Sequence, residues 1–283
     1  LSRHPKVFDN IFINMIKAGE ASGQLDDVLD RLATHMEESE ELKGEIKSAM
    51  TYPVVSLVMI CCISLGLLVF VLPQFRDIFD SLKQDMPILT EAVMNLSDLA
   101  QSNFGLILFS VLGSILGIRM LINTHRGRRV WDALILRIPI FGPLMQKTIV
   151  SRFSGTFATL IRSGVPILGA LEIVSKTTGN VHYSEAIEKS AEAVRQGENL
   201  GNPLSRTKRF PPMVCRMIAI GERSGSLEQL LEKVSQFYDS EVRSTVKQLT
   251  SLIEPFLILI MGGVVGTMVL AMFLPLLQMI GNM

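Results

Sequence analysis

Three long apolar runs constrain this chain more than any other feature of its sequence. They cover residues 54–72, 104–122 and 256–274, and the first and third contain no charged residue. The middle run carries Arg119 near its end, where a long side chain can reach the lipid headgroups. At about 1.5 Å per residue, each run covers most of the roughly 30 Å hydrocarbon core of a bilayer. The sequence therefore predicts three membrane-spanning helices.

The charges beside these runs predict the orientation of the chain. The loop at residues 74–103 carries two basic residues against five acidic ones, whereas Arg126, Arg128 and Arg129 directly follow the middle run. The positive-inside rule makes these three arginines topology-determining, with the arginines in the cytoplasm and the acidic loop outside. A contact with a partner or with anionic lipid is their alternative role. The bulk of the chain is then cytoplasmic, and the C-terminus lies outside.

The sequence also repeats itself at an offset of 202 residues. Residues 19–25 lie over residues 221–227, and Pro53 falls on Pro255 in the same register. A match that holds over roughly 65 residues indicates a duplicated unit, each copy made of helices followed by a span. The first copy begins later within its unit than the second does. We therefore expect a full-length parent to carry about 55 further residues at its N-terminus.

The remaining pattern is helical. Between residues 153 and 242 apolar residues recur at helical spacing, interrupted near Gly164, Gly179 and Gly197, and no alternating strand pattern occurs. We predict an all-α membrane protein with three transmembrane helices and two homologous cytoplasmic helical-bundle domains, the first of them truncated. The expected order is the C-terminal part of a first cytoplasmic domain (1–53), a first span (54–73), an external loop (74–103), a second span (104–122), a second cytoplasmic domain (123–255) and a third span (256–280).

The repeated motif GExSGxL supplies the first candidate site residues. They are Gly19, Glu20 and Gly23 in the first copy, and Gly221, Glu222 and Gly225 in the second. In one interpretation the glutamates contact a partner. In the structural interpretation, which we favour, the glycines permit a tight turn and the acidic residues that follow them begin a helix.

Glycine pairs in the spans are candidates for helix packing. Gly113 with Gly117, and Gly262 with Gly266, form small-xxx-small pairs that let helix backbones approach closely.

No sequence pattern indicates an active site. The four histidines and three cysteines lack metal-ligand spacing, and no phosphate loop or nucleophile motif is present. Equal numbers of basic and acidic residues, 27 each, give no indication of nucleic acid as a partner. We expect a protein that is not an enzyme, without catalytic residues, metal or cofactor. An oligomeric membrane transporter or channel subunit is the alternative, although such proteins usually need ionisable groups deep in their spans.

Together these features resemble the inner-membrane platform proteins of type II secretion systems and type IV pili. The resemblance rests on residues 153–169 (FSGTFATLIRSGVPILG), the paired GExSGxL segments, Phe210-Pro211 and the order of the spans. It implies a multi-pass protein of the bacterial inner (cytoplasmic) membrane, with a periplasmic C-terminus, that forms homo-oligomers in the bilayer. It further implies three kinds of protein partner: a cytoplasmic assembly or secretion ATPase, pilin or pseudopilin subunits, and other inner-membrane assembly proteins. The platform would couple the ATPase to polymerisation of those subunits, and the sequence leaves open whether the product is a pilus or a secretion system.

Overall fold

The computed structural model describes residues 10–23, 25–75, 87–139 and 141–281. These residues form helices and turns and contain no strand, which confirms the predicted all-α fold. The chain divides into two compact units, which we describe separately. The first comprises Leu1–Lys47 and Ile122–Lys247, and the second comprises Ser48–Leu121 and Gln248–Met283.

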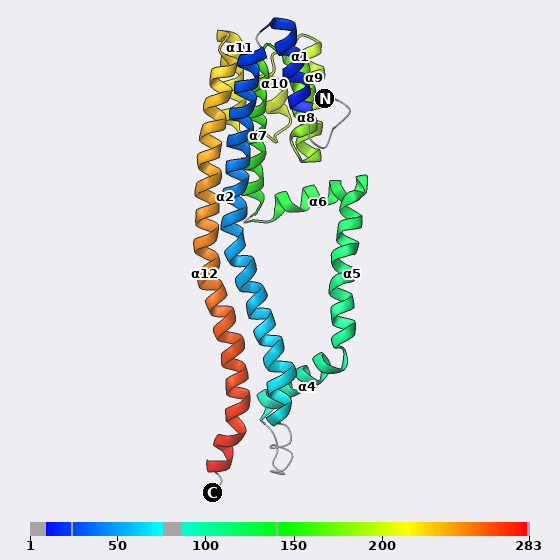
Figure 1. The fold of residues 1–283 in the computed structure, drawn as a ribbon, viewed down its shortest axis with the longest axis vertical. Helices are drawn as coiled ribbons and strands as arrows, with labels where there is room; N and C mark the ends of the chain where they lie inside the picture. Colours follow the sequence, from blue (N-terminus) through cyan, green and yellow to red (C-terminus); the bar gives the residue numbers. More distant parts are fainter. Residues whose placement is uncertain (1–9, 24, 76–86, 140, 282–283) are drawn as a thin grey trace. The chain divides into compact units, whose positions relative to one another are not determined.

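The first unit is a bundle of short helices with the beginnings of two long ones (Figure 1). Its elements are α1 (Asn10–Ser22), the first part of α2 (Leu25–Gly66), α6 (His125–Arg137), α7 (Phe141–Arg162), α8 (Ile167–Thr177), α9 (Val181–Arg195), α10 (Gly201–Arg206), α11 (Pro212–Ser224) and the first part of α12 (Leu227–Gly281). The helices expected from apolar spacing are present as α7, α8, α9, α11 and α12. Helices α6 and α10 were not expected from the sequence.

Local sequence explains where these helices begin and end. Gly164 has a φ of 80°, a left-handed conformation that ends α7 and that residues with a Cβ rarely adopt. Asn180 begins α9, because its side chain accepts hydrogen bonds from the backbone N–H groups of His182 at 3.0 Å and Tyr183 at 3.4 Å.

One apolar core holds the first unit together. Phe153 and Phe157 of α7 are fully buried, and the Phe153 ring lies 4.8 Å from the ring of Phe210 between centroids. Met15 of α1 and Leu32 of α2 belong to the same core. The part of the first copy that precedes its span is therefore packed onto the helices of the second copy. The domain limits predicted at residues 53 and 255 stay predictions.

The second unit contains the remainder of α2 and α12 together with α4 (Ile88–Ser102) and α5 (Phe104–Asn123). After Gly66 the chain continues as a π-helical segment, η1 (Leu67–Val71). Helix α4, which was not predicted within the loop at residues 74–103, supplies hydrogen-bond donors to this segment. Ser97 Oγ donates to the carbonyl of Leu68 at 2.5 Å, and Gln101 Nε2 donates to that of Val69 at 3.1 Å. These side chains give the widened turn additional hydrogen-bond partners.

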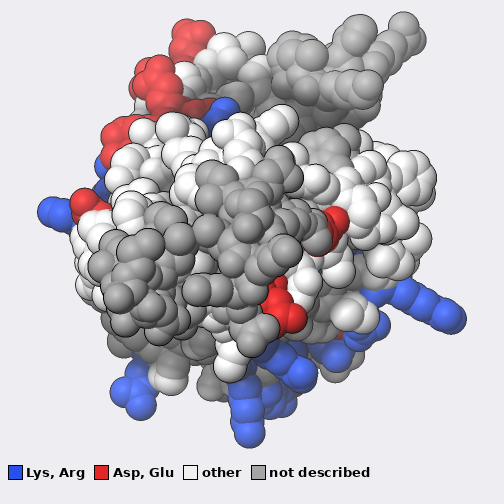
Figure 2. Space-filling model, turned by 90° about the horizontal axis from the view of Figure 1, so that it is seen from below, with Lys and Arg blue, Asp and Glu red and all other residues white. Residues whose placement is uncertain are grey.

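Two helices of the described residues are long and apolar enough to cross a membrane. They run over Leu25–Phe75 and Leu227–Pro275, which confirms the first and third predicted spans by length and composition. Large apolar side chains on them, such as Phe70 (71% exposed) and Leu259 (70%), face away from the protein, as contact with lipid requires. Most of the described surface in the view of Figure 2 is likewise uncharged. Helix α5 covers the second predicted span, which stays a prediction.

Two prolines at equivalent repeat positions lie inside the long helices. Pro53 is within α2 and Pro255 within α12, and the helix continues past both. A proline removes one backbone hydrogen bond but is tolerated in membrane helices when neighbouring groups compensate. The prolines thus mark the beginning of a span without ending its helix.

We predict that Phe153→Ala lowers the free energy of unfolding by about 3–5 kcal/mol, because it leaves a cavity in the shared core. The measurement is thermal exposure of the buried Cys215 thiol to a maleimide, in full-length protein whose exposed Cys61 and Cys62 are replaced by serine. Phe237→Ala is the control, since its ring is 48% exposed. Equal effects of the two substitutions would contradict the assignment of this core.

Candidate functional site

The repeated glycines form the same turn in both copies. Gly23 has a φ of 71° and Gly225 a φ of 70°, both in the left-handed region. Gly225 follows the end of α11, where its N–H donates to the carbonyl of Gly221. This conformation is strained for residues with a Cβ, so the motif has a backbone requirement independent of any partner.

The other repeated glycines allow the next helix to approach closely. A Cβ added to Gly221 would lie 2.8 Å from Leu227 Cα, and one added to Gly19 would lie 3.2 Å from Val28 Cβ. Both neighbours belong to the start of the following long helix. The lack of a side chain at these glycines therefore lets α1 pack closely against the start of α2, and α11 against the start of α12.

The two repeated glutamates have different surroundings. The Glu222 carboxylate accepts a hydrogen bond of 2.8 Å from the backbone N–H of Leu200, the buried residue at the start of α10. Glu20 is exposed on α1. Glu222 thus provides the hydrogen-bond acceptor for a backbone N–H group at the start of α10, whereas Glu20 is accessible to a partner. Whether either glutamate binds a partner stays a prediction.

The remaining predicted residues lie on surfaces. Apart from the chain neighbours and the backbone of the same helix, no described atom lies within 4 Å of the position of an added Cβ at Gly113, Gly117, Gly262 or Gly266, so their packing role stays a prediction.

The three topology arginines lie at the start of α6, where the Thr124 hydroxyl accepts a hydrogen bond from Gly127 N at 3.1 Å. Arg126 and Arg128 are exposed, and Arg129 pairs with Glu185 of α9 at 3.2 Å. Nothing in the structure tests their effect on orientation.

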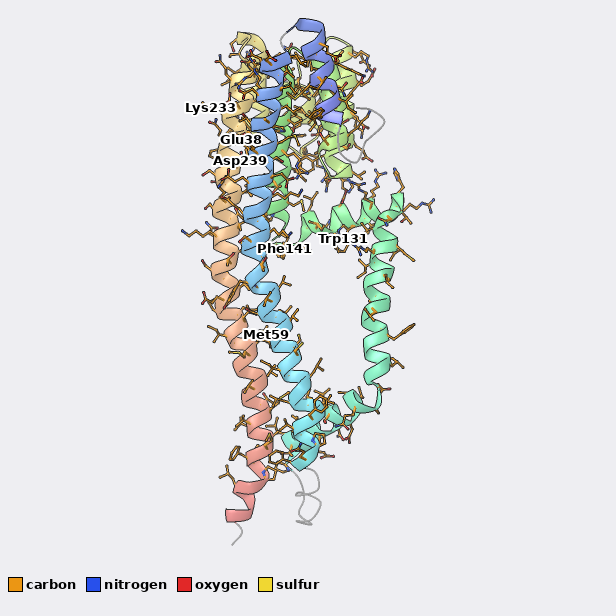
Figure 3. The ribbon with its side chains drawn as sticks, in the orientation of Figure 1. Glu38, Met59, Trp131, Phe141, Lys233 and Asp239 are labelled. Atoms are coloured by element: carbon orange, nitrogen blue, oxygen red, sulfur yellow. The ribbon has the colours of Figure 1, made fainter. Side chains whose placement is uncertain are left out.

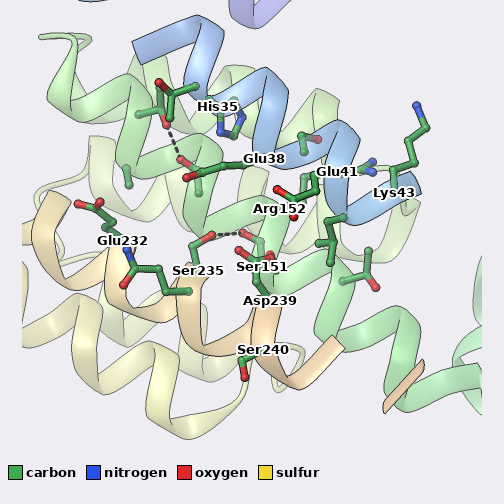
Figure 4. A pocket seen from close by; sticks show the side chains of 18 of the residues that line it. His35, Glu38, Glu41, Lys43, Ser151, Arg152, Glu232, Ser235, Asp239 and Ser240 are labelled. Carbon is green, nitrogen blue, oxygen red and sulfur yellow. Dashed lines mark hydrogen bonds between the residues drawn. The ribbon is translucent and has the colours of Figure 1, made fainter. Parts of the chain in front are cut away.

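A polar groove of about 680 Å³, which no sequence pattern predicts, lies between α2, α7 and α12 in the first unit (Figure 4). Helix α2 contributes His35, Glu38 and Glu41, and α7 contributes Ser151 and Arg152. Helix α12 contributes Glu232, Ser235 and Asp239. These residues come from three distant segments, so no local spacing brings them together in the sequence.

Ion pairs join the three helices around this groove. Arg162 of α7 pairs with Glu228 at 3.8 Å and with Glu232, both on α12. Its backbone carbonyl accepts a 2.7 Å hydrogen bond from Arg31 of α2.

Further along the same helices, Arg243 of α12 pairs with Glu41 at 3.4 Å and with Glu45, both on α2. Lys147 of α7 donates to Glu241 at 2.8 Å and to Thr245 at 2.9 Å. Most of these pairs are partly exposed, and each contributes little alone. Together they fix how α2, α7 and α12 are aligned.

Carboxylates are crowded in the groove. Partial burial raises the pKa of Glu38, and the neighbouring charges of Asp239, Glu232 and Glu41 raise it further. Figure 3 labels Glu38 on α2 and Asp239 on α12. Ser151 Oγ donates a short hydrogen bond to Asp239. Basic side chains such as Arg152 and Arg243 line the same groove, and the described residues contain no group of three or more His, Cys, Asp or Glu side chains that could hold a metal ion.

The family described as "Type II secretion system (T2SS), protein F" matches residues 1–73 and 153–275. The two matches end at the same offset as the repeat, so each covers one copy.

Individual proteins match along the whole chain. The type IV pilus assembly protein PilC of Thermus thermophilus is 43% identical over 284 residues, covering 100% of this chain and 70% of that protein. PilC of Myxococcus xanthus is 40% identical over 285 residues, covering 99% and 67%. The type II secretion system protein F of Pseudomonas aeruginosa is 34% identical over 279 residues, covering 99% and 69%.

We predict that Glu222→Ala lowers the free energy of unfolding by about 1–3 kcal/mol, because the buried N–H of Leu200 loses its acceptor. Glu20→Ala, at the same repeat position but exposed, should change it far less. Thermal exposure of Cys215 in the same serine background measures both. Equal losses would show that the motif glutamates have equivalent structural roles.

We predict that Glu38→Gln stabilises the first unit at neutral pH. Because its pKa is raised above the ordinary 4.5, ionisation of Glu38 costs the folded state more than the unfolded state. The penalty is absent below pH 4.5, develops as the pH rises and is complete above the folded pKa. The gain should stay below about 1 kcal/mol, since solvent screens this site. The measurement is the unfolding midpoint as a function of pH, with Glu37→Gln, outside the groove, as control. A gain that is larger at acidic pH than at neutral pH would contradict the mechanism.

Proposed function

We propose, from the premise that this chain belongs to the type II secretion system protein F family, that it is an inner-membrane platform protein for type IV pilus assembly or type II protein secretion. The observation that carries the proposal is similarity over the whole chain to proteins of both systems, with the family match on both copies of the repeat. The identity to the pilus assembly proteins is higher, which favours the pilus.

The platform would act by transmitting movement rather than by catalysis. Helix α12 is one helix of 55 residues that begins in the first unit and includes the third span. No glycine interrupts it between Gly225 and Gly262. Its first part is held to α2 and α7 by the ion pairs of Arg243 and Lys147. A movement imposed on the first unit would therefore pass along a continuous backbone into the bilayer.

The energy and the cargo would come from partners. The sequence has no phosphate loop, so a cytoplasmic ATPase is the expected source of work. Pilin or pseudopilin subunits would be the objects moved, with other inner-membrane assembly proteins and further copies of the chain around them. The same proposal places the bulk of the chain in the cytoplasm and the C-terminus in the periplasm.

Deletion of the gene tests the function. We expect loss of surface pili or of protein secretion, restored by the wild-type gene, with unchanged growth on each tested solute. Loss of solute uptake with intact pili and secretion would overturn the proposal in favour of a transporter or channel subunit.

A glycine pair tests the mechanical part. Ser240→Gly with Ser244→Gly introduces two flexible positions in α12, at about 1 kcal/mol each, which should leave membrane insertion intact. We expect complemented cells to make the protein at a normal level and to assemble few or no filaments. Glu188→Gly with Glu192→Gly in α9, which lies within one unit, is the matched control. Normal assembly with the α12 pair would contradict transmission through this helix.

A further inference from the structure

Helix α6 is anchored to the first unit through one face. The Asp132 carboxylate is buried and accepts a hydrogen bond of 2.8 Å from the backbone N–H of Val181, at the start of α9. Arg129 pairs with Glu185, and Leu136 packs against the apolar core. At 100° per residue these three side chains lie on one side of the helix.

The opposite side of α6 carries exposed apolar residues. Val130 is 68% exposed and Leu134 is 51% exposed, and both align with Ile138, which follows the last residue of α6. Trp131 lies beside this stripe, and Phe141 at the start of α7 is also exposed (Figure 3). A contiguous apolar stripe is unfavourable in contact with water, so we expect another apolar phase to cover it.

The charges around the stripe identify that phase. Arg126 and Arg137 lie along one border at helical spacing, and Arg128 lies along the other. The acidic residue of α6, Asp132, is buried on the anchored face, so every exposed charge of the helix is positive. An apolar stripe bordered by arginines fits an anionic lipid surface, where the guanidinium groups meet phosphates. A protein partner would instead need a hydrophobic groove lined by acids.

The place of α6 in the chain supports the same partner. Thr124 begins the helix two residues after the predicted second span ends at residue 122. A helix that starts there has its whole apolar stripe within reach of the headgroups.

We propose that α6 lies in the cytoplasmic headgroup layer of an anionic bilayer, with Val130, Leu134 and Trp131 in the upper acyl region. This inference rests on the predicted second span and not on the platform role, so the two can fail independently. It gives α6 a lipid-binding function beyond fixing orientation through its arginines.

Trp131 is the only tryptophan in the sequence and reports directly on this contact. The full chain is reconstituted in vesicles of phosphatidylglycerol and phosphatidylcholine whose acyl chains are brominated close to the headgroup. We expect Trp131 to lose at least about half of its fluorescence and to resist quenching by aqueous iodide, since such stripes lie about 5–10 Å deep. Quenching by iodide and not by brominated lipid would overturn the proposal. Protection from both quenchers would also overturn it, because a protein would then cover the stripe.

The tilt of α6 relative to the membrane plane is tested by placing the single tryptophan at other positions of the stripe. In a Trp131→Phe background, Leu134→Trp and Ile138→Trp should show equal losses on brominated lipid if α6 lies in the plane of the membrane. A loss that declines from residue 134 to residue 138 would mean that α6 leaves the surface, and would contradict the proposal.

Two sets of variants separate the apolar and charged contributions. Leu134→Glu should reduce the quenching of Trp131 at least about twofold, whereas Ile220→Glu, at a similarly exposed position of α11, should not. Arg126→Gln combined with Arg128→Gln and Arg137→Gln should reduce it in phosphatidylglycerol vesicles but not in pure phosphatidylcholine. Equal effects of Leu134→Glu and Ile220→Glu, or of the arginine variants in both lipids, would contradict the proposal.

Discussion

The structure depends on one constraint, the need of a chain in hydrocarbon to satisfy its own backbone hydrogen bonds. Only helices and closed barrels do this, and the apolar runs of this chain form helices. The first parts of α2 and α12 are continuous with those helices, which explains why the longest elements have an exposed apolar part and a polar part with ion pairs. The polar groove and the paired arginines lie in the parts that the bilayer does not constrain.

The same constraint explains the hydrogen bonds around η1. A π-helical turn departs from the regular backbone ladder, so its carbonyl groups need other hydrogen-bond donors. Hydroxyl and amide groups of α4 serve instead, with Ser97 and Gln101 donating to the carbonyls of Leu68 and Val69. Thr90 of α4 donates in the same way to the carbonyl of Ala271 on α12, at 2.7 Å. The segment that the sequence predicts to be an acidic loop therefore contains a helix, α4, that contributes to the structure of its unit.

The duplication shows how one sequence pattern serves two environments. Leu231 and Tyr238 of α12 are buried in the first unit, at 1% and 7% exposure. Their counterparts in α2, Leu29 and Met36, are 40% and 49% exposed. The turns between the paired helices are the same, because Gly23 and Gly225 share one backbone conformation. What differs is the set of helices available to cover each face, as it does for Glu222 and Glu20.

The sequence by itself determined the helical class, the apolar runs, the repeat with its two glycine turns, and the family. The helical class, the apolar runs and the glycine turns follow from local spacing, since hydrophobic periodicity, left-handed glycines and span length are properties of consecutive residues. The repeat and the family follow from comparing long segments of the sequence. Only the tertiary structure decided that Met15 and Leu32 join the core of Phe153, that Glu222 meets Leu200, and that Glu38 lies beside Asp239. Those contacts join residues far apart along the chain. The sequence does not distinguish an exposed side chain from a paired one, because the pairing depends on packing that brings the partner within a few ångströms.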